Sequence, residues 1–167
     1  ATRAPKKFDD TIVDLIQNVD SLKIHSYTDN SGIVEVREKI AKNLNERFDT
    51  DFEAGNITMT VGAGGALNTV LRVVLDPEDE VIVFAPFFSE YIHYVGNFYG
   101  KVVVVKPDLD TFQPNMEEFK SKITAKTKAI IVNTPNNPSG VVYKEETIKE
   151  IADILNQKQE EYGHEIY

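Results

Sequence analysis

Two loops of this chain carry residues whose types and spacing could bind a ligand. Residues 62–65 read Gly-Ala-Gly-Gly and stand between a short apolar run and an apolar helical pattern. Small residues let the backbone approach a ligand closely, and the N–H groups at the start of a helix carry partial positive charge. The loop is therefore typical of a phosphate cradle, although a tight strand-to-helix turn without a ligand needs the same residues.

The glycine-rich loop differs from the common nucleotide-binding motifs. A P-loop continues with Gly-Lys-Ser/Thr, which this loop does not, and Asn68 stands where the dinucleotide fingerprint has glycine or alanine. The residues themselves leave a phosphate loop and a plain turn open.

The second loop covers residues 133–140 and reads NTPNNPSG. Its prolines restrict the backbone, and its asparagine side chains can hydrogen-bond a ligand oxygen without adding charge. An ordinary Asn/Pro turn is the alternative. Eight turn residues are more than a plain connection needs, so we interpret the segment as a preorganised ligand loop.

The elements that hold these loops follow from hydrophobic patterning. Apolar runs predict strands, and apolar residues at helical spacing predict helices between them. Such alternation is typical of βαβ units, so we predict an α/β fold with a mostly parallel sheet and helices on both faces. Ligands bind at the carboxyl ends of strands in these sheets, where both loops stand. The predicted strands are ITMTV (57–61), EVIVF (80–84), KVVVV (101–105) and KAIIV (128–132). The predicted helices cover or centre on residues 9–22, 36–48, 67–74, 91–98, 115–123 and 148–155.

Local signals mark where several elements begin. Asn115 and Glu118, three residues apart, predict a capping box, and YTDNSG at residues 27–32 predicts a turn. Ile166 and Tyr167 follow the last helical pattern and are expected to begin a further strand. We therefore expect the sequence to be part of a longer protein.

Composition narrows the function classes. The 167 residues suit one domain or slightly more, and 41% hydrophobic with 27% charged residues is a globular composition. A net charge of −9 argues against nucleic-acid binding. With no cysteine there are no disulfides or thiolate sites, and three histidines without helical spacing give no metal site. No apolar run approaches the ~20 residues of a membrane helix, so we expect a cytoplasmic protein without a membrane partner.

Several segments, in order and at similar spacing, resemble the class I/II aminotransferases, which are pyridoxal-phosphate enzymes of fold type I. They are YTDNSGIVEVREKIA, VGAGGALNTVLRVVLDPEDEVIVFAPFFSEY and ITAKTKAIIVNTPNNPSGVVY. The resemblance covers nearly the whole chain from about Tyr27 onward. It implies that residues 1–30 form an N-terminal helix and a cross-subunit segment. It also implies that residues 31–167 form part of the cofactor-binding large domain, truncated at its C-terminal end.

The resemblance also implies a set of cofactor-binding residues. Backbone N–H groups at Ala63 and Gly64 match those that hold the cofactor phosphate. Phe88 matches the aromatic residue that stacks on the pyridine ring, and Asn137 matches the asparagine that hydrogen-bonds the phenolic oxygen. Tyr27 matches the tyrosine that reaches the phosphate in the neighbouring subunit. A core phenylalanine and a loop-capping tyrosine are the alternatives for Phe88 and Tyr27.

Other parts of the family pattern fall outside these residues. The family's Schiff-base lysine, its pyridine-binding aspartate and its substrate-binding arginine come later than the last residue here. Lys144 and Lys149 do not match the lysine motif, so we expect no catalytic residue in this chain and no activity from it alone. The glycine–proline motif usual near the family's N-terminus is also missing. Arg37 matches an arginine that we interpret as structural.

The resemblance implies that the parent protein is a homodimer that transfers an amino group between an amino acid and a 2-oxo acid. A β-lyase or a decarboxylase on the same fold is the alternative within the family. A non-catalytic module with a nucleotide-like site is the alternative from another class. The residues do not identify the amino acid.

Overall fold

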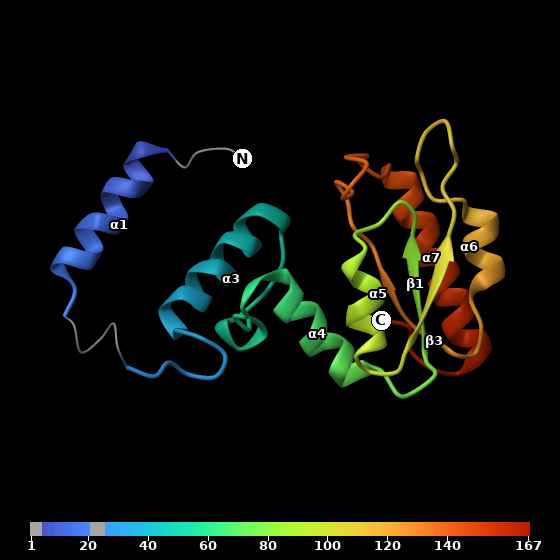
Figure 1. The fold of residues 1–167 in the computed structure, drawn as a ribbon, viewed down its shortest axis with the longest axis horizontal. Helices are drawn as coiled ribbons and strands as arrows, with labels where there is room; N and C mark the ends of the chain where they lie inside the picture. The colour runs from blue at the N-terminus through green and yellow to red at the C-terminus, as the bar shows by residue number, and fades with distance from the viewer. Residues whose placement is uncertain (1–4, 21–25) are drawn as a thin grey trace. The chain divides into compact units, whose positions relative to one another are not determined.

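The computed structural model describes residues 5–20 and 26–167 (Figure 1). The chain forms two compact units, Ala1–Thr60 and Val61–Tyr167. In the first unit the elements are α1 (Lys6–Asn18), α3 (Val34–Phe48) and the 3₁₀ turn η1 (Ala54–Asn56). In the second they are α4 (Gly62–Val74), β1 (Glu80–Phe84), α5 (Glu90–Gly96), β2 (Lys101–Val105), α6 (Met116–Lys122), β3 (Thr127–Ile131) and α7 (Glu145–Tyr162).

The second unit is built on a parallel three-stranded sheet in the order β2-β1-β3. β1 pairs in parallel with both neighbours, so that Val83 lies opposite Val104 on one side and Ile131 on the other. The central strand is β-branched and almost wholly buried, as expected for a parallel strand covered on both faces. The predicted fold class is therefore confirmed.

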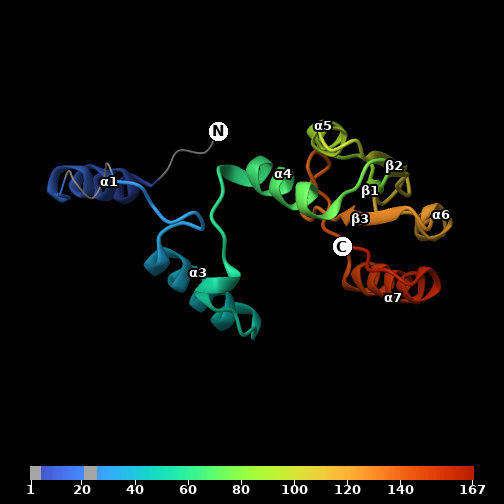
Figure 2. The ribbon, with the colours of Figure 1, turned by 90° about the horizontal axis from the view of Figure 1, so that it is seen from below.

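Helices cover both faces of this sheet, because consecutive strand residues point in opposite directions. Val81 packs with Leu71 of α4 and Val95 of α5, whereas Ile82 packs with Phe119 of α6 and Ile151 of α7. Figure 2 shows α5 on one side of the strands and α7 on the other. Two apolar clusters thus hold the sheet between its helix layers.

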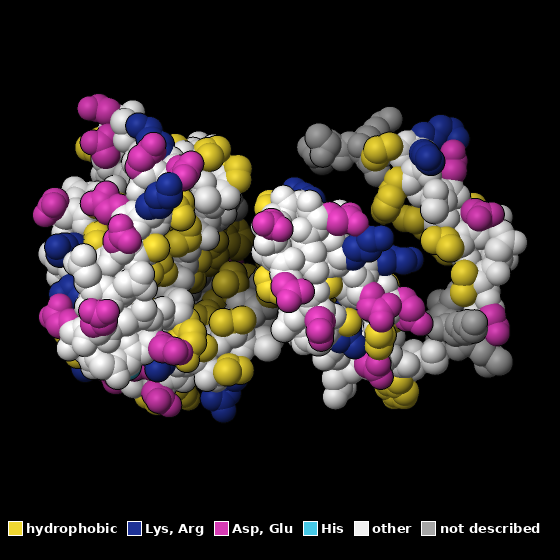
Figure 3. Space-filling view, turned by 180° about the vertical axis from the view of Figure 1, so that it is seen from behind, with side chains coloured by type: hydrophobic (Ala, Val, Ile, Leu, Met, Phe, Trp, Pro, Cys, Tyr) yellow, Lys and Arg dark blue, Asp and Glu magenta, His cyan; other side chains and the backbone are white. Residues whose placement is uncertain are grey.

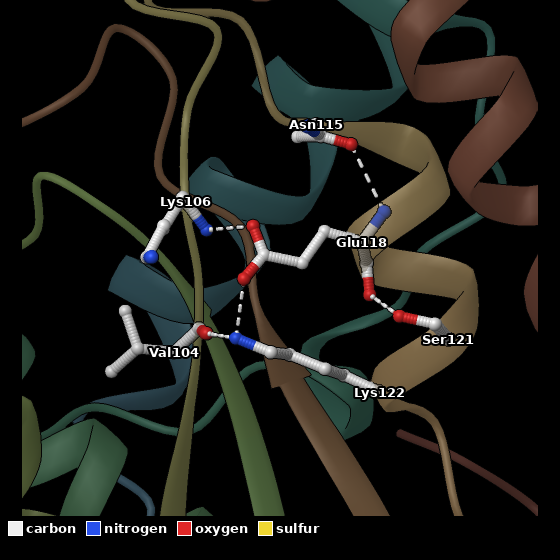
Figure 4. A network of polar contacts seen from close by, with 6 residues as sticks. All are labelled: Val104, Lys106, Asn115, Glu118, Ser121 and Lys122. Atoms are coloured by element: carbon white, nitrogen blue, oxygen red, sulfur yellow. Dashed lines mark hydrogen bonds and ion pairs between the residues drawn. The ribbon is translucent and has the colours of Figure 1, made fainter.

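Helix α6 is held against β2 by a network of polar contacts (Figure 4). The Asn115 side chain accepts a hydrogen bond from the Glu118 N–H at 2.9 Å, which confirms the first half of the predicted capping box. The Glu118 carboxylate does not return to Asn115. It accepts from the Lys106 N–H at 2.9 Å and pairs with Lys122, whose Nζ also donates to the Val104 carbonyl.

Two predictions from the sequence differ from the structure. One predicted strand is wrong, and one predicted helix extends past the described residues. ITMTV is not a strand, because residues 57–60 adopt no regular structure and the Met59 N–H donates to the Ser31 carbonyl instead of a strand ladder. The first helix ends at Asn18, and the predicted extension to Leu22 reaches beyond the described residues. The other helices and strands form within a few residues of the predicted positions.

The turn before α3 is held by Gly32 and Arg37. Gly32 has a φ of 94°, and a Cβ there would lie 2.5 Å from the Met59 side chain, so only glycine fits without rearrangement. Arg37 donates from Nε to the Gly32 carbonyl and from a terminal nitrogen to the Ala54 carbonyl, at 3.0 and 2.7 Å. These contacts support the structural interpretation of Arg37.

Tyr167 extends the sheet beyond β3. Its N–H donates to the Lys128 carbonyl at 3.0 Å, and its carbonyl accepts from the Ile130 N–H at 2.7 Å. Two bonds that bracket Ala129 in this way are the pattern of a parallel ladder. Ile166 is buried in the same apolar cluster as Phe119. Tyr167 thus makes the first hydrogen bonds expected of a further strand, although residues 163–167 are not themselves a strand.

Within residues 5–20 and 26–167, no helix is long and apolar enough to cross a membrane. The same described residues contain no cluster of three or more histidine or acidic side chains able to hold a metal ion.

Candidate cofactor site

The carboxyl ends of β1 and β3 form the topological switch point of the sheet. The chain leaves β1 to reach β2 on one side, whereas it leaves β3 to reach Tyr167 on the other. Connections that diverge in this way open a crevice between the two strand ends, where open α/β sheets bind ligands. The proline-aromatic segment at residues 86–88 and the NTPNNPSG loop lead out of these strands.

Tyr91 of α5 joins the two loops. Its hydroxyl accepts a hydrogen bond from the Asn133 amide at 3.2 Å, across 42 residues of sequence. Its buried ring lies parallel to Phe87 at 6.4 Å between centroids and edge-on to Phe88 at 5.9 Å. Edge-on and offset pairs of this kind fix ring orientation. Tyr91 therefore orients the aromatic pair beside the start of the asparagine loop.

One turn further along α5, Tyr94 contacts the start of α4. A Cβ built on Gly64 would lie 2.9 Å from the Tyr94 hydroxyl, so the absence of a side chain at Gly64 lets this contact form. Asn97 of α5 donates to the Asn68 side chain of α4 at 2.9 Å, which adds a second link. Tyr91 and Tyr94 are three residues apart and share a helix side. Through them α5 contacts both the glycine-rich start of α4 and the loops after β1 and β3.

The start of α4 carries the features of an anion site. Gly62 begins the helix with a φ of 72°. Gly62 and Ala63 are exposed and Gly64 is half-buried. The first-turn N–H groups of a helix have no partner within the helix and point outward with the positive end of its dipole. This geometry suits the phosphate-cradle interpretation of residues 62–65.

The NTPNNPSG loop places neighbouring asparagines differently. Asn136 is buried, whereas Asn137 is exposed and makes no side-chain hydrogen bond with the part of the chain that the structure describes. Gly140 closes the loop with a φ of 75° and donates its N–H to the Asn136 carbonyl at 2.7 Å. The amide of Asn137 is therefore not used to hold the described part of the loop together.

The other residues singled out in the sequence occupy varied positions. Phe88 is 37% exposed, so it is not fully buried in the core of the described residues. Tyr27 belongs to the first compact unit, and its side chain is fully exposed. Lys144 lies before α7, and Lys149 pairs with Glu145 on the exposed side of that helix.

The sequence did not reveal the separate positions of Asn133 and Asn136 or the contacts of Tyr91 with both loops. It placed Tyr91 in the predicted helix at residues 91–98 and the two asparagines in a polar loop. Burial raises the pKa of the Tyr143 hydroxyl, and the Asn136 side chain opposes that rise.

Comparison with known proteins assigns the fold and its loops to one family. The family model for aminotransferases of class I and II matches residues 3–160. The chain belongs to the class I and II aminotransferase family. An aspartate aminotransferase from Thermotoga maritima is 41% identical over 133 residues, which cover 79% of this chain. A probable aspartate/prephenate aminotransferase from Thermus aquaticus is 38% identical over 149 residues, or 84% of the chain.

Solved structures of this aminotransferase family give the same result. An amino transferase from Eubacterium rectale superposes with a TM-score of 0.94 at 41% identity, over 98% of this chain and 41% of its own. An aspartate aminotransferase from Thermus thermophilus superposes at 0.85 with 29% identity, over 99% and 41%. The chain spans 35% and 39% of the two curated relatives named above, so it corresponds to little more than a third of their length.

The residues at the switch point fit part of pyridoxal phosphate. The first-turn N–H groups of α4 suit a phosphate, a partly exposed phenylalanine ring suits an aromatic ring, and an exposed amide suits a phenolic oxygen. The donor set carries no charged side chain, which leaves charge neutralisation of the phosphate to other groups.

Proposed function

We propose that the protein to which this chain belongs is a pyridoxal-phosphate-dependent aminotransferase that moves an amino group between an amino acid and a 2-oxo acid. The observation that carries this proposal is the gathering of three family loops around α5. Tyr94 contacts the glycine-rich start of α4, and Tyr91 contacts both Phe88 and Asn133. The family assignment supports the same function, since its named relatives are aminotransferases.

Each residue has a defined task in this proposal. The N–H groups of Ala63 and Gly64 bind the phosphate, the Phe88 ring packs against the pyridine face, and the Asn137 amide donates to the phenolic oxygen. When bound, pyridoxal phosphate supplies an electron sink that stabilises negative charge at the substrate's α-carbon. The protein's own contribution is to orient the ring by stacking and to fix its register through the amide and the phosphate.

The proposal includes a homodimer in the cytoplasm, with Tyr27 reaching the phosphate of the neighbouring subunit. The apolar side chains of α1 support assembly, because none of them is buried in this chain and a helix with an exposed apolar face needs a partner surface. Figure 3 shows apolar side chains along this helix. The exposed ones are Phe8, Ile12, Val13, Leu15 and Ile16.

The test uses the full-length protein purified with pyridoxal phosphate. We expect visible absorbance from the lysine-bound cofactor and transfer of the amino group from one member of an amino-acid panel to a 2-oxo acid. Aspartate heads the panel, because several similar relatives are named aspartate aminotransferases. Release of ammonia or carbon dioxide without a new amino acid would replace the proposal by a lyase or a decarboxylase. Absence of visible absorbance would favour a nucleotide-like binding module.

A matched pair of variants links the activity to the asparagine loop. Asn137→Ala removes the proposed donor to the cofactor, whereas Asn43→Ala removes an exposed amide on α3. Only Asn137→Ala is expected to weaken cofactor binding, by roughly ten-fold for one hydrogen bond to a charged oxygen. Equal cofactor affinity in both variants would contradict the assignment of Asn137.

A further inference from the structure

Asn136 uses its polar groups to hold the NTPNNPSG loop in one conformation. Its N–H donates to the Val141 carbonyl at 2.8 Å, and its carbonyl accepts from the Gly140 N–H at 2.7 Å. Its side-chain oxygen accepts from both the N–H and the hydroxyl of Ser139, at 3.1 and 2.8 Å. Asn136 and Thr127 are the buried polar residues among those the structure describes. A buried side chain with this many partners specifies a single loop geometry.

The loop is anchored to the core through Tyr143. The Tyr143 N–H donates to the Thr134 hydroxyl at 2.8 Å. The Tyr143 ring is buried and lies edge-on to Phe84, the last residue of β1, at 6.2 Å. Tyr143 therefore connects the loop that Asn136 holds to the carboxyl end of β1, where the candidate site lies.

We infer that Asn136 is a positioning residue whose hydrogen bonds hold the exposed amide of Asn137 toward the cofactor. The inference rests on the proposed function, because it assigns Asn137 as the residue that contacts the bound group. Asn136 itself is buried and its side chain is hydrogen-bonded to Ser139 within the loop, so it acts through its neighbour. Loss of its side chain frees the loop to sample other conformations. The loop then has to become ordered when the cofactor binds, which lowers the affinity for the cofactor.

The test compares variants of the full-length protein by cofactor affinity, by the absorption maximum of the bound cofactor and by the melting temperature of the apoprotein. Asn136→Ala is expected to weaken cofactor binding about ten-fold or more and to move the absorption maximum in the same direction as Asn137→Ala. Thr127→Val is the control. It removes a buried hydroxyl that accepts the Thr124 N–H at the opposite end of the same strand. It is expected to lower the melting temperature and leave affinity and absorbance unchanged.

A second variant keeps the inference testable where Asn136→Ala fails to fold. Ser139→Ala removes the hydroxyl that donates to the Asn136 side chain and keeps the Ser139 N–H, which donates to the same oxygen. It is expected to weaken cofactor binding by a smaller factor, about two- to five-fold, since the N–H contact remains. Unchanged affinity in Asn136→Ala, or unchanged affinity in Ser139→Ala when the first variant is unfolded, overturns the inference.

A double variant separates this inference from the proposed function. If Asn136 acts through Asn137, adding Asn136→Ala to Asn137→Ala weakens binding less than two-fold further. A full additional ten-fold loss would mean that Asn136 acts by another route, which overturns the inference while the cofactor assignment stands. If Asn137→Ala alone leaves affinity and absorbance unchanged, the proposed contact of Asn137 fails, and the inference fails with it.

Discussion

At the residue scale, Gly62 decides how the proposed phosphate loop is shaped. Its φ of 72° lies in the left-handed region, and the space around its α-carbon is open. A side chain at this position would therefore strain the backbone, but it would not clash with a neighbouring residue. The next two residues, Ala63 and Gly64, carry the N–H groups assigned to the phosphate, so relief of strain at Gly62 would turn them away.

Gly62→Ala is expected to lower the free energy of unfolding by about 1–2 kcal/mol, the cost of left-handed backbone for an L-residue. It should also weaken binding of pyridoxal phosphate to the full-length protein. Gly55→Ala is the matched control, because its α-carbon is equally open and its φ is not in the left-handed region. Denaturant unfolding and cofactor titration of both variants check this. Identical unfolding curves for the two would contradict a specific conformational role of Gly62.

Sequence motifs could locate the residues proposed to face a ligand but not those that hold them. Phe88 and Asn137 stand in motifs shared with a family, and both are exposed, as their proposed tasks require. The bond between Asn133 and Tyr91 spans 42 residues and joins two neutral side chains, for which no periodic pattern exists. Asn136 and Asn137 are adjacent and identical in type, so only the folded loop decides which is buried.

At the element scale, apolar runs predicted strands correctly where the folded chain supplies a neighbouring strand, and wrongly where it does not. β1, β2 and β3 each pair with a neighbour along most of their length. ITMTV alternates like a half-buried strand, yet the Met59 N–H donates to the Ser31 carbonyl and residues 57–60 form no strand. Strand structure depends on a ladder of hydrogen bonds supplied by distant residues, so a local pattern predicts it less surely than it predicts a helix.

The attachment of α6 to β2 makes stability depend on pH through Glu118. Its contacts with Lys122 and with the Lys106 N–H lower the pKa of the carboxyl below the ordinary 4.5. The carboxylate therefore stabilises the folded state above the unfolded pKa, and this contribution is lost as the pH falls through the lower folded pKa.

Glu118→Gln is accordingly expected to cost about 1 kcal/mol of stability at pH 7 and progressively less below about pH 4. Glu145→Gln is the control, since Glu145 pairs with Lys149 on an exposed helix face and such pairs contribute little. Melting temperatures of both variants and of the parent protein across this pH range check the prediction. A Glu118→Gln difference that stays constant down to pH 3 would show that the carboxylate charge is not responsible.

At the scale of the whole molecule, the described residues supply one side of the proposed cofactor site. The start of α4 and the loops after β1 and β3 offer backbone N–H groups, an aromatic ring and an amide, whereas Lys144 is exposed and Lys149 pairs with Glu145 on α7. Neither lysine matches the lysine motif of the family.

The 167-residue chain by itself is therefore expected to give no amino transfer above the rate of free pyridoxal phosphate. Without a lysine to bind the cofactor and move the proton, only ring orientation remains, which does not provide acid–base catalysis. Assays of the purified chain with a panel of amino acids and 2-oxo acids check this against the full-length protein. Turnover well above the cofactor alone would mean that one of the lysines present is catalytic.

Assembly adds the remaining proposed contact, from Tyr27 to the phosphate of the neighbouring subunit. Tyr27 is fully exposed in the chain, so its hydroxyl is available to a partner. Tyr27→Phe removes that hydroxyl alone, and a hydrogen bond to a charged oxygen is worth about 1.5–3 kcal/mol, or ten-fold and more in affinity. Tyr99→Phe is the control, since Tyr99 is also largely exposed but stands after α5 in the second unit.

Measurements of cofactor affinity and of thermal stability distinguish the two roles considered for Tyr27. A cross-subunit contact predicts weaker cofactor binding in Tyr27→Phe, an unchanged melting temperature of the apoprotein, and affinity in the parent protein that falls when dilution dissociates the dimer. A tyrosine that only caps its own loop predicts a lower melting temperature with unchanged affinity. Because each outcome moves one quantity and not the other, measuring both over a dilution series decides whether the site is completed by a second subunit.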